Sequence, residues 1–135
     1  MTAALRIALL ALSISFAASC ARGQGVIGTD GRYFVRENGE PLLVVGHNEG
    51  IDWPYIEALW NEPGATGEAI VRNYFREIAA DGVNTIRLFA EYPLAGIYLQ
   101  NPDGSLVEEN WRKLERLIDL AGEFDIYVLL GPYDP

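Results

Sequence analysis

The chain has 135 residues, of which 50% are hydrophobic and 21% are charged, a composition typical of a folded globular protein and not of a disordered chain. Acidic residues outnumber basic ones by 19 to 10, and the formal net charge of −9 disfavours binding to nucleic acid or to an anionic membrane surface through clustered basic residues. Neutral or cationic partners are favoured instead.

Residues 1–20 have the pattern of a signal peptide. Arg6 is the only charged side chain before an apolar run over residues 7–19, which is shorter than the roughly 20 residues that a membrane-spanning helix needs. The single cysteine, Cys20, directly follows this run, at a position similar to that of the cysteine that is lipidated in bacterial lipoproteins. Lipidation of Cys20 and simple secretion both fit the pattern. Either one predicts an extracytoplasmic protein that is secreted, periplasmic or lipid-anchored at the cell surface.

A short linker over residues 21–32 is expected to lead into a folded domain over residues 33–135. Asn38-Gly39 separates two β-prone runs and predicts a hairpin, because both residues tolerate the positive φ of a tight turn. The continuous apolar run Leu42–Val45 is typical of a parallel strand that is buried on both faces. The residues that would mark the exit of that strand are Gly46, His47, Asn48 and Glu49.

The middle of the sequence predicts a long loop, a helix and a second strand. Residues 49–66 show no sustained period and read as a loop, with a helical turn over residues 55–60. Thr66 is expected to cap the helix that follows, and Gly82 to end it. The apolar stripe of this helix consists of Ile70, Val71, Tyr74, Phe75, Ile78 and Ala79. The second strand is predicted over Val83–Phe89.

A second loop, helix and strand complete the sequence pattern. The loop covers residues 90–105 and contains a turn over residues 101–104. The next helix is predicted to bury one face, formed by Trp111, Leu114, Ile118 and Ala121. The third strand is predicted over Ile126–Leu130.

This order of elements is β-α-β-α-β and predicts an α/β fold with parallel strands and right-handed crossovers. A (β/α)8 barrel and a doubly wound open sheet both fit the order. Because His47-Asn48-Glu49 follows the first strand where a glycine-rich phosphate loop would stand, nucleotide binding has no support and the barrel is favoured. A complete TIM barrel needs roughly 250 residues, so the fold class predicted is the N-terminal portion of a barrel, preceded by a hairpin and incomplete in this chain.

Three stretches resemble clan A glycoside hydrolases, especially the family 5 cellulase and mannanase group. They are the hairpin and strand exit over residues 34–48, the run Gly82-Val83-Asn84-Thr85-Ile86-Arg87-Leu88, and residues 117–130. The resemblance implies hydrolysis of O-glycosyl bonds in a polysaccharide or oligosaccharide, with no cofactor. It places the two catalytic glutamates beyond Pro135, so no catalytic pair is assigned in this chain. It also implies that Arg87 contacts the nucleophilic carboxylate.

Other polar and aromatic residues near the predicted strand ends are candidates for contact with a sugar. Each also has a simpler structural interpretation: Arg87 could pair with Glu91 at the barrel rim, and His47 could serve only as a structural hydrogen-bonding group. Loop aromatics can stack on sugar rings or plug the top of a barrel. A metal site is not expected with one histidine. The candidates are Arg87, His47, Asn48, Glu91, Trp53, Tyr92, Tyr133 and Asp134.

Three other functions fit the same pattern. The first is a carbohydrate-binding protein on the same fold that lacks the catalytic glutamates. The second is another sugar-acting barrel enzyme, such as a metal-dependent isomerase. The third is a cell-surface interaction protein with an open α/β domain.

Overall fold

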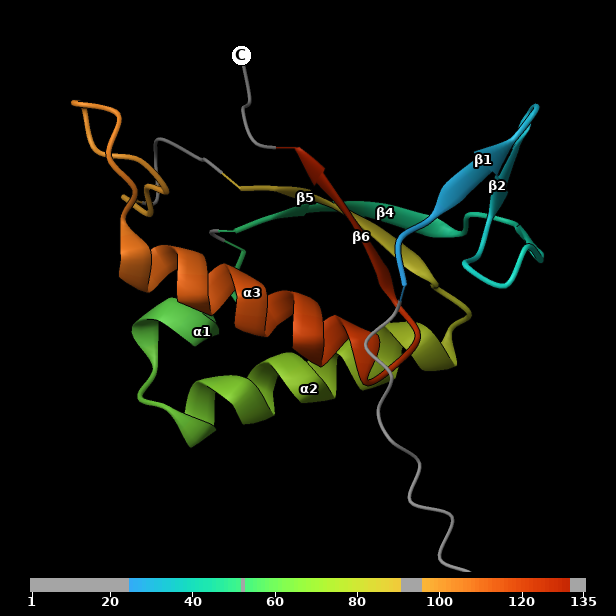
Figure 1. Ribbon diagram of the computed structural model, residues 1–135. Coiled ribbons are helices and arrows are strands. Elements are labelled where there is room, and N and C mark those ends of the chain that lie inside the picture. The colour runs from blue at the N-terminus through green and yellow to red at the C-terminus, as the bar shows by residue number, and fades with distance from the viewer. Residues whose placement is uncertain (1–24, 52, 91–95, 132–135) are drawn as a thin grey trace, which may run out of the picture.

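A parallel sheet covered on one face by helices forms the larger part of the structure, and a small antiparallel sheet lies beside the amino-terminal ends of its strands (Figure 1). The computed structural model describes residues 25–51, 53–90 and 96–131. The antiparallel strands are β1 (Gly28–Asp30), β2 (Tyr33–Val35) and β3 (Pro41–Leu42). The parallel strands are β4 (Gly46–Gly50), β5 (Thr85–Phe89) and β6 (Tyr127–Gly131), and the helices are α1 (Ala58–Asn61), α2 (Ala65–Ala80) and α3 (Glu108–Gly122).

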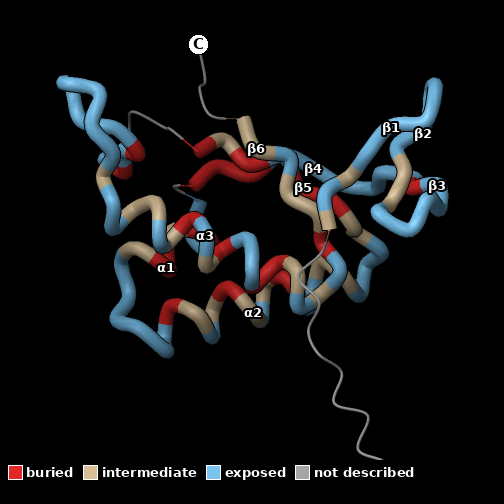
Figure 2. Tube along the Cα trace, in the orientation of Figure 1, coloured by how far each residue is buried: buried red, intermediate tan, exposed pale blue. Residues whose placement is uncertain are grey.

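The parallel sheet confirms the predicted β-α-β-α-β order. Its strands pair in the order β4-β5-β6, both pairings are parallel, and each crossover passes through helix. All three helices lie on the same face of the sheet (Figure 1). Buried residues gather where the helices face the sheet (Figure 2), and the core there includes Ile86 and Leu88 of β5, Phe75 of α2 and Leu117 of α3.

The prediction that Leu42–Val45 forms the first parallel strand is wrong. Leu42 pairs antiparallel with Phe34 of β2, while Leu43 is 80% exposed and the first parallel strand begins only at Gly46. The side chain of Asn84 explains the difference. Its Oδ1 accepts the amide of Val45 at 2.9 Å and its Nδ2 donates to the carbonyl of Leu43 at 2.7 Å, so this apolar segment is tied to the start of β5 outside the ladder.

Gly46 allows β4 to approach β5 closely at the amino-terminal end of the sheet. A Cβ at this position would overlap the carbonyl oxygen of Thr85, which is the register partner of Gly46. The backbone could relieve that overlap only by moving the two strands apart. The pairing therefore requires glycine here.

The hairpin predicted at Asn38-Gly39 is confirmed between β2 and β3. Gly39 has a φ of 81°, and the Asn38 side chain accepts the amide of Glu40 at 3.1 Å. The segment predicted as a linker differs in part, because its residues 28–30 form β1 and pair antiparallel with β2. Arg36, just after β2, donates from Nη1 to the hydroxyl of Tyr127 at 3.0 Å and so joins the small sheet to β6.

α2 follows the predicted apolar stripe but begins differently. Its N-cap residue is Gly64, no side chain caps it, and Thr66 lies inside the helix, so the predicted Thr66 cap is wrong. Val71 and Phe75 are fully buried, and Gly82, with a φ of 88°, follows the end of the helix as predicted.

α3 buries a face that is rotated from the predicted one. Ile118 is 42% exposed, whereas Leu117 and Leu120 are fully buried between the helix and the sheet. Trp111 packs against the core and donates from its indole nitrogen to the carbonyl of Leu99 at 2.9 Å. In the described part of the chain, no helix combines the length and the apolar character that a membrane span requires.

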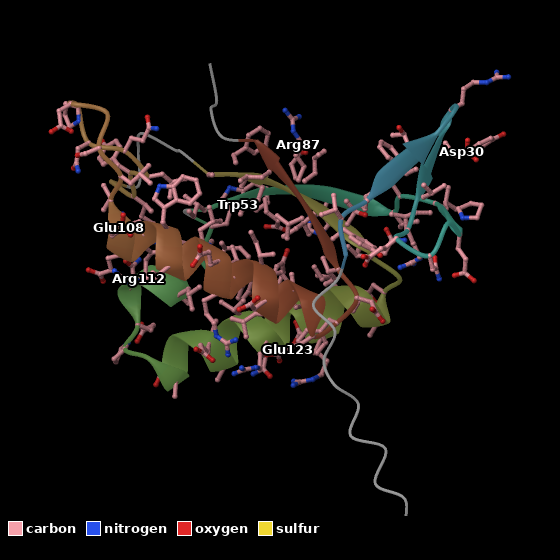
Figure 3. All side chains as sticks on the ribbon, viewed as in Figure 1. Asp30, Trp53, Arg87, Glu108, Arg112 and Glu123 are labelled. Carbon is pink, nitrogen blue, oxygen red and sulfur yellow. The ribbon has the colours of Figure 1, made fainter. Side chains whose placement is uncertain are left out.

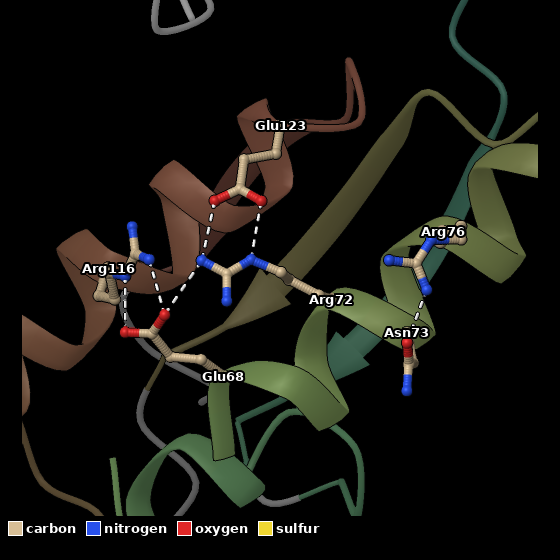
Figure 4. Close-up of polar contacts among 6 residues, drawn as sticks. All are labelled: Glu68, Arg72, Asn73, Arg76, Arg116 and Glu123. Carbon is tan, nitrogen blue, oxygen red and sulfur yellow. Dashed lines mark hydrogen bonds and ion pairs between the residues drawn. The ribbon is translucent and has the colours of Figure 1, made fainter. Parts of the chain in front are cut away.

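A network of ion pairs joins α2 to α3 (Figure 4). Arg116 of α3 donates to both carboxylate oxygens of Glu68, at 2.9 and 2.7 Å. Arg72 donates to both oxygens of Glu123, at 2.8 and 3.1 Å, and also lies 3.1 Å from Glu68. Bidentate contacts of this kind fix the relative position of the two helices as well as contributing charge attraction.

Candidate functional site

The face of the parallel sheet that the helices leave uncovered carries the candidate site. Ile86 and Leu88 point into the helix-covered core, so Arg87 between them points the other way, as side chains alternate along a strand. Figure 3 shows Arg87 extending from the sheet on the side away from the helices. Its register partners are Asn48 on β4 and Leu129 on β6, and in-register neighbours on a parallel sheet share a face.

Arg87 has an unpaired positive charge among the residues that the structure describes. Its guanidinium carbon lies 4.6 Å from the centre of the Phe89 ring, a cation–π contact on the same face of the strand. No described carboxylate lies within ion-pair distance of it. The suggested alternative partner, Glu91, lies outside the described residues. The arrangement leaves the guanidinium free to bind a carboxylate or a hydroxyl group.

Asn48 lies beside Arg87, whereas His47 does not. Both residues were predicted at the exit of the first strand, and this is wrong because both lie within β4. Asn48 is exposed and in register with Arg87, so the two side chains stand about 5 Å apart on the same face. His47 is in register with Ile86 and faces the helix side, where its Nδ1 lies 3.0 Å from Oε1 of Glu49. The structure therefore separates His47 from Arg87.

Trp53 lies at the carboxyl end of β4, in the predicted loop (Figure 3). Its amide donates to the carbonyl of Gly50 at 3.1 Å, and its own carbonyl accepts the amides of Ile56 and Glu57 at 2.9 and 2.8 Å. Because the side chain is 44% exposed, one part of the indole is available for contact with a ligand. The remaining predicted site residues lie outside the described residues: Glu91, Tyr92, Tyr133, Asp134 and the predicted lipidation site Cys20.

Glu49 is a buried carboxyl group, although its place in the sequence predicts an exposed residue at a strand exit. It is 1% exposed, lies on the helix side of β4 and accepts a hydrogen bond from the hydroxyl of Tyr74 on α2. Burial raises its pKa, while the Tyr74 hydroxyl and His47 act in the opposite direction. Burial and the neighbouring Glu49 in turn raise the pKa of Tyr74. A raised pKa is typical of a catalytic acid, but a residue sealed under a helix cannot reach a substrate on the opposite face.

Two grooves occur elsewhere on the molecule. One, of about 730 Å³, lies along β6 between α3 and the small sheet, and the other, of about 570 Å³, lies between α3 and the loop that joins α1 to α2. Arg87 lines neither of them. Among residues 25–51, 53–90 and 96–131, no group of three or more His, Cys, Asp or Glu side chains is placed to hold a metal ion.

The fold, but not the sequence, is similar to that of a known protein. No protein-family model matches the sequence, and no curated protein matches it. A solved structure described as "Glycoside hydrolase" is similar with a TM-score of 0.50 and 18% sequence identity, over 80% of this chain and 25% of that chain. The chain thus spans about a quarter of the length of that protein. The described residues form a mixed α/β fold with a three-stranded parallel sheet, and this fold is like part of a glycoside hydrolase.

Proposed function

We propose that residues 25–131 form the first three β/α units of a (β/α)8 barrel, and that this barrel belongs to a retaining glycoside hydrolase of clan A related to the family 5 cellulases and mannanases. Two observations support the barrel. Both crossovers place their helices on the same face of the sheet, whereas a doubly wound sheet carries helices on both faces. The structural likeness covers part of a glycoside hydrolase.

The observation that carries the functional proposal is the position of Arg87. In a barrel, the face opposite the helices is the interior, and the carboxyl ends of the strands surround the active site. Arg87 lies on that face, two residues before the end of β5, with no described carboxylate to neutralise it. An arginine in this place can donate two hydrogen bonds to a catalytic carboxylate and keep it ionised at neutral pH.

Retaining hydrolysis needs two carboxyl groups about 5 Å apart, one acting as nucleophile and the other as proton donor. Glu49 does not qualify, because it is buried on the opposite face of the sheet from Arg87. We therefore assign both catalytic carboxyl groups to residues outside 25–131. In this proposal Arg87 positions the nucleophile, Asn48 binds a sugar hydroxyl, and the exposed indole of Trp53 stacks on a sugar ring.

We also propose that the enzyme acts outside the cytoplasm, after cleavage of its signal peptide either just before Cys20, which then becomes the lipidated N-terminal residue, or close to it, as in simple secretion. Mass spectrometry of the protein purified from its host would give the mature N-terminus. A diacylglycerol mass on Cys20 that disappears in Cys20→Ser would establish the lipid anchor. An unmodified N-terminus near residue 20 would establish simple secretion, and an intact Met1 would contradict both.

The functional test uses the full polypeptide encoded by the reading frame that contains this chain. It would be assayed on soluble β-glucans and mannans for release of reducing ends, as wild type, Arg87→Ala and Arg87→Lys. We expect Arg87→Ala to reduce kcat by at least about 100-fold, as for the loss of one strong electrostatic contact in an active site. Arg87→Lys keeps the positive charge but cannot make the bidentate hydrogen bond, so it should retain only part of the wild-type activity.

A second readout separates positioning from a merely structural role. Without Arg87 the nucleophile should need a higher pH to ionise, so the acidic limb of the kcat/KM profile should move to higher pH. Arg32→Ala, in the exposed turn between β1 and β2, is the matched control and should leave activity unchanged. Full activity in Arg87→Ala would contradict the proposed role. Sugar binding by the wild type without hydrolysis would favour the carbohydrate-binding alternative.

A further inference from the structure

A polar cluster on the helix side of the sheet lies apart from the candidate site. Its centre is Glu49 of β4, whose Oε1 accepts the Tyr74 hydroxyl and lies 3.0 Å from Nδ1 of His47. Tyr74 in turn stacks on Tyr55, with ring centres 5.1 Å apart and planes inclined by only 8°. The cluster therefore joins three parts of the chain: β4, α2 and the loop that follows β4.

The two oxygen atoms of the Glu49 carboxyl group differ in their polar contacts. Both polar contacts of the carboxyl group meet at Oε1, a hydrogen bond from Tyr74 and a 3.0 Å contact with Nδ1 of His47, and the described part of the chain supplies no donor to Oε2. A buried carboxylate without a full set of donors is costly, whereas a neutral carboxyl group at the same place is tolerated. Burial accordingly has the largest effect on the pKa of Glu49 and raises it, against the smaller opposite effects of Tyr74 and His47.

Among the residues that the structure describes, His47 and Tyr74 are the groups that act with burial on the pKa of Glu49. From β4 the titratable group that faces Glu49 is His47, and from α2 it is Tyr74. The register neighbour on β5 is the apolar Leu88. Tyr55 of the loop reaches the cluster only through its stack on Tyr74.

We propose that the Glu49–Tyr74–His47 cluster is a proton-sensitive contact between β4 and α2. A protonated Glu49 lets α2 pack closely on β4. Ionisation favours entry of water to the carboxylate, which loosens the contact and, through the Tyr74–Tyr55 stack, the loop that carries Trp53. The contact would thus make the loop more ordered in acid than at neutral pH. This proposal does not depend on the proposed glycosidase activity.

The sign of the linkage follows from the direction of the shift. Because the folded protein holds the proton on Glu49 more tightly than the unfolded chain does, this contribution is fully present below the ordinary glutamate pKa. It is lost as the pH rises through the folded value. A glutamine at this position cannot ionise and should remove the dependence.

The test compares thermal unfolding of the 135-residue chain and its Glu49→Gln variant between about pH 4 and pH 8. The melting temperature of the variant minus that of the wild type should rise with pH. The total rise should be about 5 °C for each unit by which burial raises the pKa of Glu49. Glu77→Gln, an exposed glutamate on the same helix, is the matched control and should give a constant difference. A constant difference for Glu49→Gln as well would overturn the proposal.

Two further measurements keep the proposal testable if Glu49→Gln does not fold. Tyr74→Phe removes the donor to the ionised form, so its stability should fall more steeply with rising pH than that of the wild type; a parallel curve would contradict the proposal. Hydrogen exchange reports on the loop, because the amides of Ile56 and Glu57 bond to the carbonyl of Trp53. Each amide's protection factor, which corrects for intrinsic exchange, should be several-fold lower at neutral pH than in acid in the wild type. Equal protection at both pH values would overturn the coupling to the loop.

Discussion

Substitution of Glu68 by glutamine tests whether the ion pairs between α2 and α3 stabilise the fold. Glu68 receives two hydrogen bonds from Arg116 and a charged contact from Arg72, and its side chain is 28% exposed. The Arg116 hydrogen bonds are the largest cause that lowers the pKa of Glu68 from 4.5 to about 2. Taken alone, this shift would correspond to a contribution of roughly 3 kcal/mol to the free energy of unfolding at neutral pH.

Solvent screening reduces that figure. Both arginines are about a third exposed, and exposed ion pairs typically contribute about 0.2–1 kcal/mol each. With two partners in good geometry, we expect Glu68→Gln to lower the free energy of unfolding by about 1–2 kcal/mol at neutral pH. Because the folded pKa is depressed, the contribution is present above pH 4.5 and is lost as the pH falls toward 2.

Urea denaturation followed by circular dichroism measures this effect at about pH 7 and again at about pH 3, where more than half of the difference between wild type and Glu68→Gln should have disappeared. Glu109→Gln is the matched control, since Glu109 pairs with Lys113 on one helix but is 75% exposed. It should change the stability by less than about 0.5 kcal/mol. The reasoning would be refuted by a Glu68→Gln variant as stable as the wild type at neutral pH, or by a difference that is the same at both pH values.

Three further substitutions test the fold, each by urea denaturation at neutral pH. Asn84→Ala removes the two side-chain hydrogen bonds that hold residues 43 and 45 and should cost about 2 kcal/mol; a loss near zero would mean that water replaces them freely. Gly46→Ala should cost about 1–3 kcal/mol by forcing β4 away from Thr85, and unchanged stability would contradict the close approach. Phe75→Ala should cost about 3–5 kcal/mol because the ring is fully buried, and a loss below about 1 kcal/mol would contradict its place in the core.

The sequence alone determined those helices, strands and turns whose residues carry strong local conformational preferences. The hairpin at Asn38-Gly39 follows from two residues that tolerate positive φ, and the strand around Arg87 follows from a short apolar run after a glycine that ends a helix. The parallel direction of the strands follows from the intervening helices. Each of these features depends on neighbours in sequence.

Tertiary contacts decided the features that the sequence analysis misplaced. Leu42–Val45 has the composition of a buried strand, yet Asn84, about forty residues away, binds the backbone of this segment and leaves the polar run from Gly46 to form β4. The error hid the burial of Glu49 and put His47 at a strand exit. Ile118 was misassigned for a similar reason, since the periodicity of a helix shows a stripe but not which edge of it the sheet covers.

The same distinction applies to the candidate site. The sequence placed Arg87 near the end of a strand, but the face on which it lies depends on where the helices pack, and its neighbours depend on the register with β4. Because side chains alternate along a strand, a change of one position moves a residue to the opposite face. Register set by hydrogen bonds between distant segments therefore brought Asn48 beside Arg87 and placed His47 next to Glu49 on the opposite face of the sheet.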